Sequence, residues 1–200
     1  MTAKQGRQGI IARQTSETNI ALTLGIDGAG RTNIASGVPF LDHMLTLFAV
    51  HGFFDLDVQA TGDTEVDDHH TVEDLGICLG QAMKQALGDF RSIRRYGHCL
   101  LPMDEALVFM AVDFSNRPFL DYGVTVPDQK VGTFDTALAR EFLMALILHA
   151  GLTMHVELAH GENTHHILEA VFKALGKVLD QATTIEPRTG ERPLSSKGSL

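Results

Sequence analysis

Two short stretches of the chain carry paired histidines followed three residues later by a glutamate, and these are side chains that ligate metal ions. The stretches read Asp67-Asp68-His69-His70-Thr71-Val72-Glu73-Asp74 and Thr164-His165-His166-Ile167-Leu168-Glu169. If Asp68 caps a helix, His69 and Glu73 lie one turn apart on one face of it, while His70 points about 100° away. Each stretch therefore predicts one ligand pair plus a histidine that serves a different metal.

The ligand chemistry restricts the choice of metal. Neutral imidazoles combined with carboxylates and no thiolate suit manganese, iron, cobalt, nickel or zinc, and the sequence does not choose among them. Because the arrangement occurs twice in one chain, we interpret it as two related metal sites rather than a coincidence.

The elements that must carry these residues follow from apolar spacing and turn residues. In the first part of the chain we expect strands at 10–15 and 19–26, a Gly28-Ala29-Gly30 turn with a return strand at 31–36, a helix at 39–52, a strand at 53–60 and a helix at 68–87. In the second part we expect a strand at 106–114, a return strand at 118–124, a helix at 134–149, a strand at 153–159 and a helix at 164–182.

Counted from the strand at 19–26, the order β-β-α-β-α therefore occurs twice, which predicts an α+β fold built by tandem duplication. We expect the halves 1–92 and 93–185 to pack as one pseudo-twofold unit, because no linker-like composition separates them. The polar tail 186–200 should be mobile when alone. The register between the copies places His43 opposite Glu141.

This register completes two predicted ligand sets, in which His70 and His166 each cross to the metal of the other copy. One set comprises His69, Glu73, His166 and Glu141, and the other comprises His165, Glu169, His70 and His43. Alone on an apolar helix, His43 would be interpreted as a structural histidine, and Glu141 as a solvent-facing residue that follows Arg140.

Composition excludes several classes of protein. The 200 residues are 44% hydrophobic, which is enough for one substantial core or two small fused ones, and the net charge of -9 disfavours non-specific nucleic-acid binding. No apolar run approaches the roughly 18 residues of a membrane span. Cys78 and Cys99 lack the spacing of a disulfide framework or thiolate metal site. The N-terminus has no apolar leader, so we expect a cytoplasmic protein.

Further stretches complete a pattern found in a known family. They are Gly37-Val38-Pro39-Phe40-Leu41-Asp42-His43-Met44-Leu45, Asn116-Arg117-Pro118, His165-His166-Ile167-Leu168-Glu169-Ala170-Val171-Phe172-Lys173-Ala174 and the terminal Ser195-Ser196-Lys197-Gly198. Together with residues 67–74 they resemble the imidazoleglycerol-phosphate dehydratase family of histidine biosynthesis over nearly the whole chain. The chain departs from this pattern at Glu141, where the family often has a histidine.

The resemblance implies a duplicated fold of the ribosomal S5 domain 2-like type, two manganese ions per site and a twenty-four-chain assembly with sites shared between subunits. The implied reaction converts imidazole-glycerol phosphate to imidazole-acetol phosphate and water through a dimetal-bound imidazolate. Glu17 is the implied acid/base, and Asp104 and Glu105 remain alternatives from the second copy. The residues implied to bind the substrate, chiefly its phosphate, are Arg95, Arg117, Lys173, Ser195 and Lys197.

Two other function classes are compatible with the residues themselves. Paired histidines and carboxylates also suit a dinuclear metallohydrolase, and only its zinc-protease version is disfavoured by the lack of His-Glu-x-x-His. A non-catalytic protein whose metals staple subunits together is the third possibility. An assay for loss of imidazole-glycerol phosphate in the presence of manganese separates the three.

Overall fold

The computed structural model of the chain describes residues 6–200, so the first half predicted at 1–92 is described from residue 6 onward. Its elements are β1 (Gln8–Gln14), β2 (Thr18–Gly25), β3 (Thr32–Ala35), α1 (Pro39–Gly52), β4 (Asp55–Gly62), α2 (His69–Leu87), β5 (Tyr96–Met103), β6 (Ala106–Asp113), β7 (Phe119–Gly123), β8 (Lys130–Val131), β9 (Phe134–Asp135), α3 (Leu138–Ala150), β10 (Thr153–His160) and α4 (Thr164–Thr183). A short 3-10 turn at Pro187–Thr189 begins the tail.

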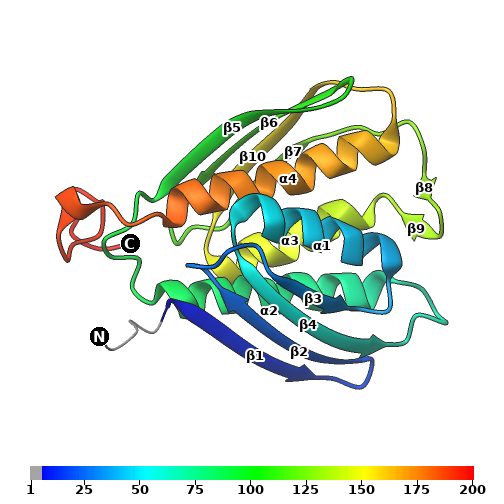
Figure 1. The fold of residues 1–200 in the computed structure, drawn as a ribbon, viewed down its shortest axis with the longest axis horizontal. Coiled ribbons are helices and arrows are strands. Elements are labelled where there is room, and N and C mark those ends of the chain that lie inside the picture. The colour runs from blue at the N-terminus through cyan, green and yellow to red at the C-terminus, as the bar shows by residue number, and fades with distance from the viewer. Residues whose placement is uncertain (1–5) are drawn as a thin grey trace.

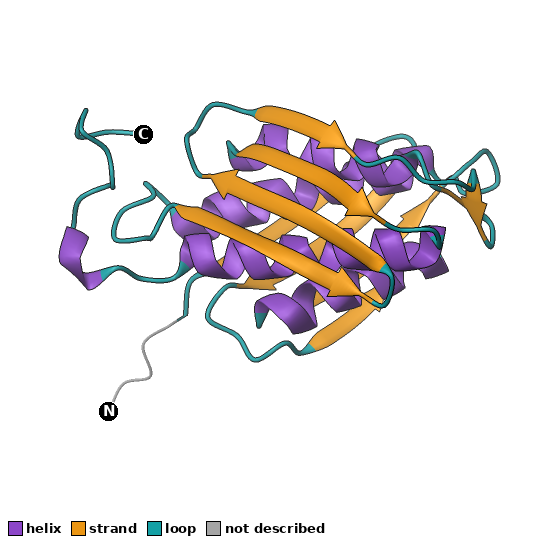
Figure 2. Cartoon of the chain, turned by 90° about the horizontal axis from the view of Figure 1, so that it is seen from above, coloured by secondary structure: helices purple, strands orange, loops and turns teal. Residues whose placement is uncertain are grey.

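Two four-stranded sheets form the outer layers and the four long helices lie between them (Figure 1). The strand orders are β1-β2-β4-β3 and β5-β6-β10-β7, so the two halves repeat one topology. Figure 2, viewed from above, shows one sheet lying across the helical layer. The predicted α+β class and the tandem duplication are confirmed.

The pairing predicted for the two return strands is wrong. β3 pairs in parallel with β4, and β7 pairs in parallel with β10, so neither contacts the strand that precedes it in sequence. On the side of β2 that faces away from β1, the neighbour is the antiparallel β4. It occupies the position beside β2 that a hairpin return strand would have taken. Alternating apolar residues indicate strands, but they do not say which strands are neighbours.

The structure also adds β5, which the sequence analysis did not predict. Tyr96–Met103 contains a glycine, a proline and no β-branched residue, so it carries little intrinsic preference for a strand. It is held instead by antiparallel pairing with β6 along its whole length. The predicted helix at 134–149 begins only at Leu138, because Phe134–Asp135 pairs with β8 as a short hairpin.

The helices pack across the two halves, with α2 against α3 and α1 against α4. Close contact depends on glycines: a Cβ on Gly80 would lie 2.5 Å from the Leu146 carbonyl oxygen, and one on Gly176 would lie 2.4 Å from that of Phe48. Buried side chains from both halves form one hydrophobic core. Packing across the halves places the first-half helix α1, which carries His43, beside the second-half helix α4.

Among residues 6–200, no helix combines the length and the apolar character that crossing a bilayer would require.

Candidate metal centre

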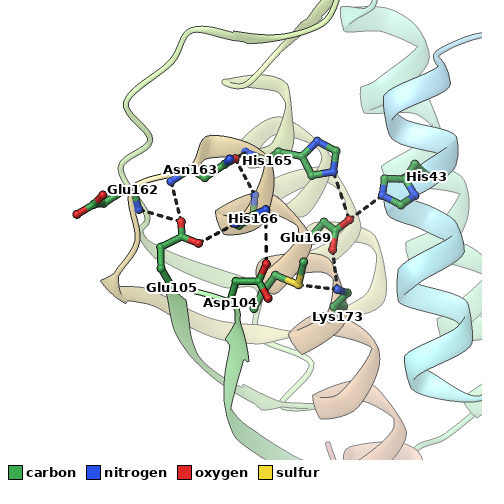
Figure 3. A network of polar contacts seen from close by, with 10 residues as sticks. His43, Asp104, Glu105, Glu162, Asn163, His165, His166, Glu169 and Lys173 are labelled. Atoms are coloured by element: carbon green, nitrogen blue, oxygen red, sulfur yellow. Dashed lines mark hydrogen bonds and ion pairs between the residues drawn. The ribbon is translucent and has the colours of Figure 1, made fainter.

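Three predicted ligands converge where α1 meets the beginning of α4. Nε2 of His43 lies 2.8 Å from Oε1 of Glu169, and Nε2 of His165 lies 3.2 Å from the same oxygen (Figure 3). The ligand atoms of the three residues all lie within 4.8 Å of one another. Two imidazole nitrogens and one carboxylate oxygen form a donor set that fits a divalent metal ion, and in the described part of the chain this is the one such set of three.

Glu169 is the buried member of this cluster, with 8% of its surface exposed. Burial alone would raise the pKa of its carboxyl group, but hydrogen bonds from Lys173 and His43 outweigh that effect and lower the pKa to about 2. Nζ of Lys173, one turn further along α4, donates to Oε2 at 2.6 Å. The carboxylate is therefore ionised and oriented, which is the form that ligates a metal.

An asparagine or aspartate side chain accepts hydrogen bonds from backbone N–H groups at the start of both helices that carry the paired histidines. At α4, Oδ1 of Asn163 accepts hydrogen bonds from the backbone N–H groups of His165 and His166. At α2 the predicted cap is wrong: the side chain of Asp68 makes no capping hydrogen bond, and Oδ1 of Asp67 accepts from the His69 N–H at 2.8 Å instead. Asp68 already has helical backbone angles, so its side chain cannot reach back as a cap.

The second predicted set is assembled only in part. His69 and Glu141 line the same cavity, which Asp68 and Lys130 also line. However, Oε1 of Glu141 pairs with Arg140 at 3.1 Å, and Glu73 is exposed outside this cavity. The pairing of α2 with α3 thus brings Glu141 towards His69 in the way that α1 brings His43 towards His165, but the carboxylates do not close on one point.

His70 and His166 do not join, within one chain, the sets to which the sequence analysis assigned them. Nδ1 of His70 lies 3.0 Å from Oδ2 of Asp63, and Nδ1 of His166 lies 2.7 Å from Oε2 of Glu105. These hydrogen bonds raise the pKa of each imidazole. Each follows its neighbouring histidine by one residue on the helix, so His166 points about 100° away from His165, and His70 points about 100° away from His69.

Glu17 lies in the exposed turn between β1 and β2, and its Oε2 is 3.9 Å from Nδ1 of His70. The turn rests on a polar network that the sequence analysis missed. Asp74, 6% exposed, accepts from Oγ1 of Thr18 at 2.5 Å and from Nε of Arg13 at 3.0 Å. The sequence signal for this network was a carboxylate, Asp74, at an otherwise apolar position of helix α2, and its partner is Arg13, one residue before the end of β1.

The predicted phosphate-binding residues lie mostly at the other end of the molecule. Arg95 is buried, donates to Asp113 through Nε at 2.6 Å and Nη2 at 3.0 Å, and reaches the Leu194 carbonyl through Nη1. Its backbone N–H bonds the Ala182 carbonyl at the end of α4. At about 1.5 Å of rise per residue, α4 separates Ala182 from His165 by about 25 Å.

The tail follows the same end of the molecule (Figure 1). Ser195 lines a cavity with Arg95, and the backbone N–H of Lys197 bonds Oγ of Ser195 at 3.2 Å. Arg117 is exposed in the loop after β6. Of the five predicted substrate-binding residues other than Glu17, only Lys173 lies beside the metal ligands. One chain therefore does not bring the two groups together.

Comparison with known proteins identifies relatives of this chain. A family model described as imidazoleglycerol-phosphate dehydratase matches residues 36–179. The imidazoleglycerol-phosphate dehydratase of Halalkalibacterium halodurans is 57% identical over 194 residues, which cover 97% of this chain and 100% of that protein. The one of Syntrophobacter fumaroxidans is 58% identical over 194 residues, covering 97% and 98%.

Solved structures agree with this assignment. The imidazoleglycerol-phosphate dehydratase of Staphylococcus aureus superposes with a TM-score of 0.81 at 40% identity, covering 89% of this chain and 99% of that one. The enzyme of Pyrococcus furiosus gives 0.82 at 37% identity, covering 95% and 100%. Because relatives that are more than half identical match the chain almost from end to end, the chain belongs to the imidazoleglycerol-phosphate dehydratase family, hydro-lyases of histidine biosynthesis.

Proposed function

We propose that this chain converts imidazole-glycerol phosphate to imidazole-acetol phosphate and water in a metal-dependent reaction that uses two manganese ions per active site. The convergence of His43, His165 and Glu169 supports the metal dependence, because it presents two imidazoles and an ionised carboxylate to one point. Other divalent metals satisfy the same donor chemistry. The reaction takes place in the cytoplasm.

His43, His165 and Glu169 hold one metal, and His69, Glu73 and Glu141 contribute to the other. His70 and His166 supply the remaining donors from neighbouring chains. Metal ions bound there supply Lewis acidity to the nitrogens of the substrate imidazole. Such activation matters because the proton that leaves is on a carbon without an adjacent carbonyl group.

Glu17 moves that proton. Its carboxylate is exposed at the end of the molecule that carries the metal ligands, and 3.9 Å separates it from the imidazole of His70. A carboxylate that is not engaged in strong hydrogen bonds can accept a proton from the substrate and later donate it back. The network of Thr18, Asp74 and Arg13 beneath the turn holds Glu17 at this edge.

The substrate phosphate is bound by Arg117, Ser195 and Lys197, with Arg95 holding the tail through the Leu194 carbonyl. Guanidinium and ammonium groups are the side chains suited to a phosphate. Lys173, which pairs with Glu169, orients the metal ligand as well as adding positive charge.

One observation carries the proposal that the sites are shared between chains. The metal ligands lie at the start of α4 and the phosphate-binding residues beyond its end, about 25 Å apart along the helix. A substrate of the size of imidazole-glycerol phosphate cannot span that distance. The active protein is therefore a homo-oligomer, a twenty-four-chain assembly on the family pattern, in which one chain provides the metal end and another provides the phosphate end of each site.

Complementation between inactive chains tests this directly. His165→Ala removes a metal ligand, Arg117→Ala removes a phosphate-binding residue, and each variant alone should lose activity with manganese present. Assemblies reconstituted from an equal mixture should regain on the order of a quarter of the wild-type activity, because random mixing reunites an intact metal end with an intact phosphate end at that frequency. Mixed assemblies, verified by mass, that stay inactive would contradict the shared site.

A further inference from the structure

We propose that Glu105 and Asp63 are positioning residues that hold His166 and His70 in the one tautomer whose Nε2 can bind a metal. The inference rests on the proposed function, since it concerns the two histidines that serve metals of neighbouring chains. Neither carboxylate was predicted from the sequence for this role. The two residues occupy unrelated places in the duplicated halves.

The contact of Glu105 with His166 defines a tautomer. Oε2 of Glu105 lies 2.7 Å from Nδ1 of His166 (Figure 3). An ionised carboxylate only accepts hydrogen bonds, so Nδ1 must carry the proton, and in a neutral imidazole the lone pair is then on Nε2. The nearest recorded partner of Nε2 is Oδ2 of the exposed Asp104, at 3.8 Å, which is longer than a hydrogen bond. Nε2 is therefore available to a metal.

The same geometry occurs at His70 through a different residue. Nδ1 of His70 lies 3.2 Å from Oδ1 and 3.0 Å from Oδ2 of Asp63, which directly follows β4. Nδ1 again carries the proton and Nε2 is again left with its lone pair. Metal-binding histidines usually donate their other N–H to a carboxylate or carbonyl in this way, which fixes the ring.

The strand register shows why the halves use different carboxylates. Gln8 of β1 aligns with Tyr96 of β5, and Gly25 of β2 aligns with Asp113 of β6, so an offset of 88 carries Glu17 onto Glu105. In the second half this turn glutamate, Glu105, hydrogen-bonds to His166. In the first half Asp63 hydrogen-bonds to His70 instead, and Oε2 of the turn glutamate Glu17 lies 3.9 Å from Nδ1 of His70, which is longer than a hydrogen bond.

In the second half the position of Asp63 is occupied by Glu162. Asp55 of β4 and Thr153 of β10 are equivalent by their pairing, and the bulge between Leu158 and His160 adds one residue to β10, so Gly62 corresponds to Gly161 and Asp63 to Glu162. Figure 3 shows the carboxylate of Glu162 pointing away from His166, and the backbone N–H of Glu162 donates to Glu105 at 3.2 Å. His166 is therefore held by the turn glutamate of its half, whereas His70 is held by Asp63.

Glu105 also holds the two residues that precede α4, and this decides the design of the test. Its Oε1 accepts from the backbone N–H groups of Glu162, at 3.2 Å, and Asn163, at 2.8 Å. In Glu105→Gln the single amide oxygen keeps these two bonds and the amide NH₂ faces His166. Nδ1 must then accept, the proton moves to Nε2, and the metal loses its ligand.

The experiment titrates the full-length assembly with Mn²⁺ alone and follows free Mn²⁺ by electron paramagnetic resonance. Glu105→Gln should weaken one of the two manganese sites per chain by about 10–100-fold and leave the other unchanged. Asp63→Asn should do the same at the other site. In a His166→Ala background, Glu105→Gln should have no further effect on either dissociation constant, because the residue acts through His166.

Asn163→Ala is the matched structural control. It removes the side-chain cap of the same helix without touching Nδ1 of His166, so it should lower the melting temperature and keep both manganese sites. Two manganese sites in Glu105→Gln with dissociation constants within twofold of wild type would overturn the inference and leave the proposed function standing. A wild-type assembly that binds no manganese would overturn both.

Discussion

His43 and Glu169 lie on helices from opposite halves of the duplication, and Nε2 of His43 is 2.8 Å from Oε1 of Glu169. This contact exists because α1 packs against α4 rather than against the helix of its own half. The candidate metal site is therefore a product of the duplication, and neither half alone contains it.

Replacing Glu169 separates metal binding from stability. Glu169→Gln should abolish manganese binding at the His43–His165 site and lower the free energy of unfolding by roughly 1–3 kcal/mol, since Lys173 loses a charged hydrogen-bond partner in a mostly buried place. The additional change Lys173→Met should restore stability in denaturation curves. The double variant should still fail to bind manganese at this site. Manganese binding by the double variant would mean that Glu169 is not a ligand.

Metal removal should change the assembly as well as the activity. The predicted ligands lie on four helices, and in the proposed assembly His70 and His166 bind metals of neighbouring chains, so a bound ion would link structures that are otherwise separate. Light scattering of the protein with and without a chelator measures the mass, and thermal unfolding measures the stability. An unchanged mass together with an unchanged melting temperature after complete metal removal would refute this coupling.

Lys197→Ala should weaken substrate binding without affecting stability. Lys197 makes a backbone hydrogen bond, but its ammonium group forms no hydrogen bond or ion pair with the described residues, so its removal costs the fold no polar interaction. The KM for the substrate should rise while the melting temperature stays within error. Ser92→Ala is the comparison variant. It keeps the Lys197 ammonium group but removes the 2.6 Å hydrogen bond from Ser92 Oγ to the Gly190 carbonyl, which anchors the tail. Unchanged kinetics in Lys197→Ala would remove it from the site.

Asp55 should make the fold sensitive to acid. Its carboxylate accepts from Nε of Arg31 at 3.0 Å and from the N–H groups of Ala29 and Arg31, and the Arg31 guanidinium holds its pKa well below its usual range. Because the pKa of Asp55 is lower in the folded protein than in the unfolded chain, its ionised carboxylate stabilises the fold at pH values above the unfolded pKa of about 3.9. This stabilisation is lost as the pH falls towards the folded pKa.

Asp55→Asn should therefore lower the melting temperature by about 2–4 °C at pH 7. The difference from wild type should stay constant down to about pH 5 and shrink below about pH 4, where Asp55 becomes protonated in the unfolded chain. Asp57→Asn, which disturbs a single hydrogen bond from Asn33, is the comparison. A difference that grows on acidification would have the wrong sign for this explanation.

The sequence contained enough to predict the candidate metal ligands but not the carboxylates that hydrogen-bond to the histidines. Paired histidines one turn before a glutamate specify a helix face, and the repeat specifies its counterpart, so the positions of His165 and Glu169 follow from local spacing. Glu105 and Asp63 contact their histidines at sequence separations of 61 and 7 residues, and no periodicity connects them. Such contacts depend on strand register, which the sequence left open at β3, β5 and β7.

The phosphate end was less accessible for the same reason. Arg95 could be named from the family pattern, but its commitment to Asp113 and to the tail depends on β5, a strand whose residues do not indicate a strand. Its position some 25 Å along α4 from the metal ligands is a property of the assembled fold. That separation is the observation on which the proposed sharing of sites between chains rests.

Anomalous diffraction at the manganese edge, from crystals of the assembled protein, tests the account most directly. We expect two manganese ions per chain: one bound by His43, His165 and Glu169 with His70 of a neighbouring chain, and one bound by His69, Glu73 and Glu141 with His166 of a neighbouring chain. Glu141→Gln should weaken the second peak only. An absence of anomalous density within bonding distance of His43, His165 and Glu169, or a full second site in Glu141→Gln with that side chain facing solvent, would contradict the account.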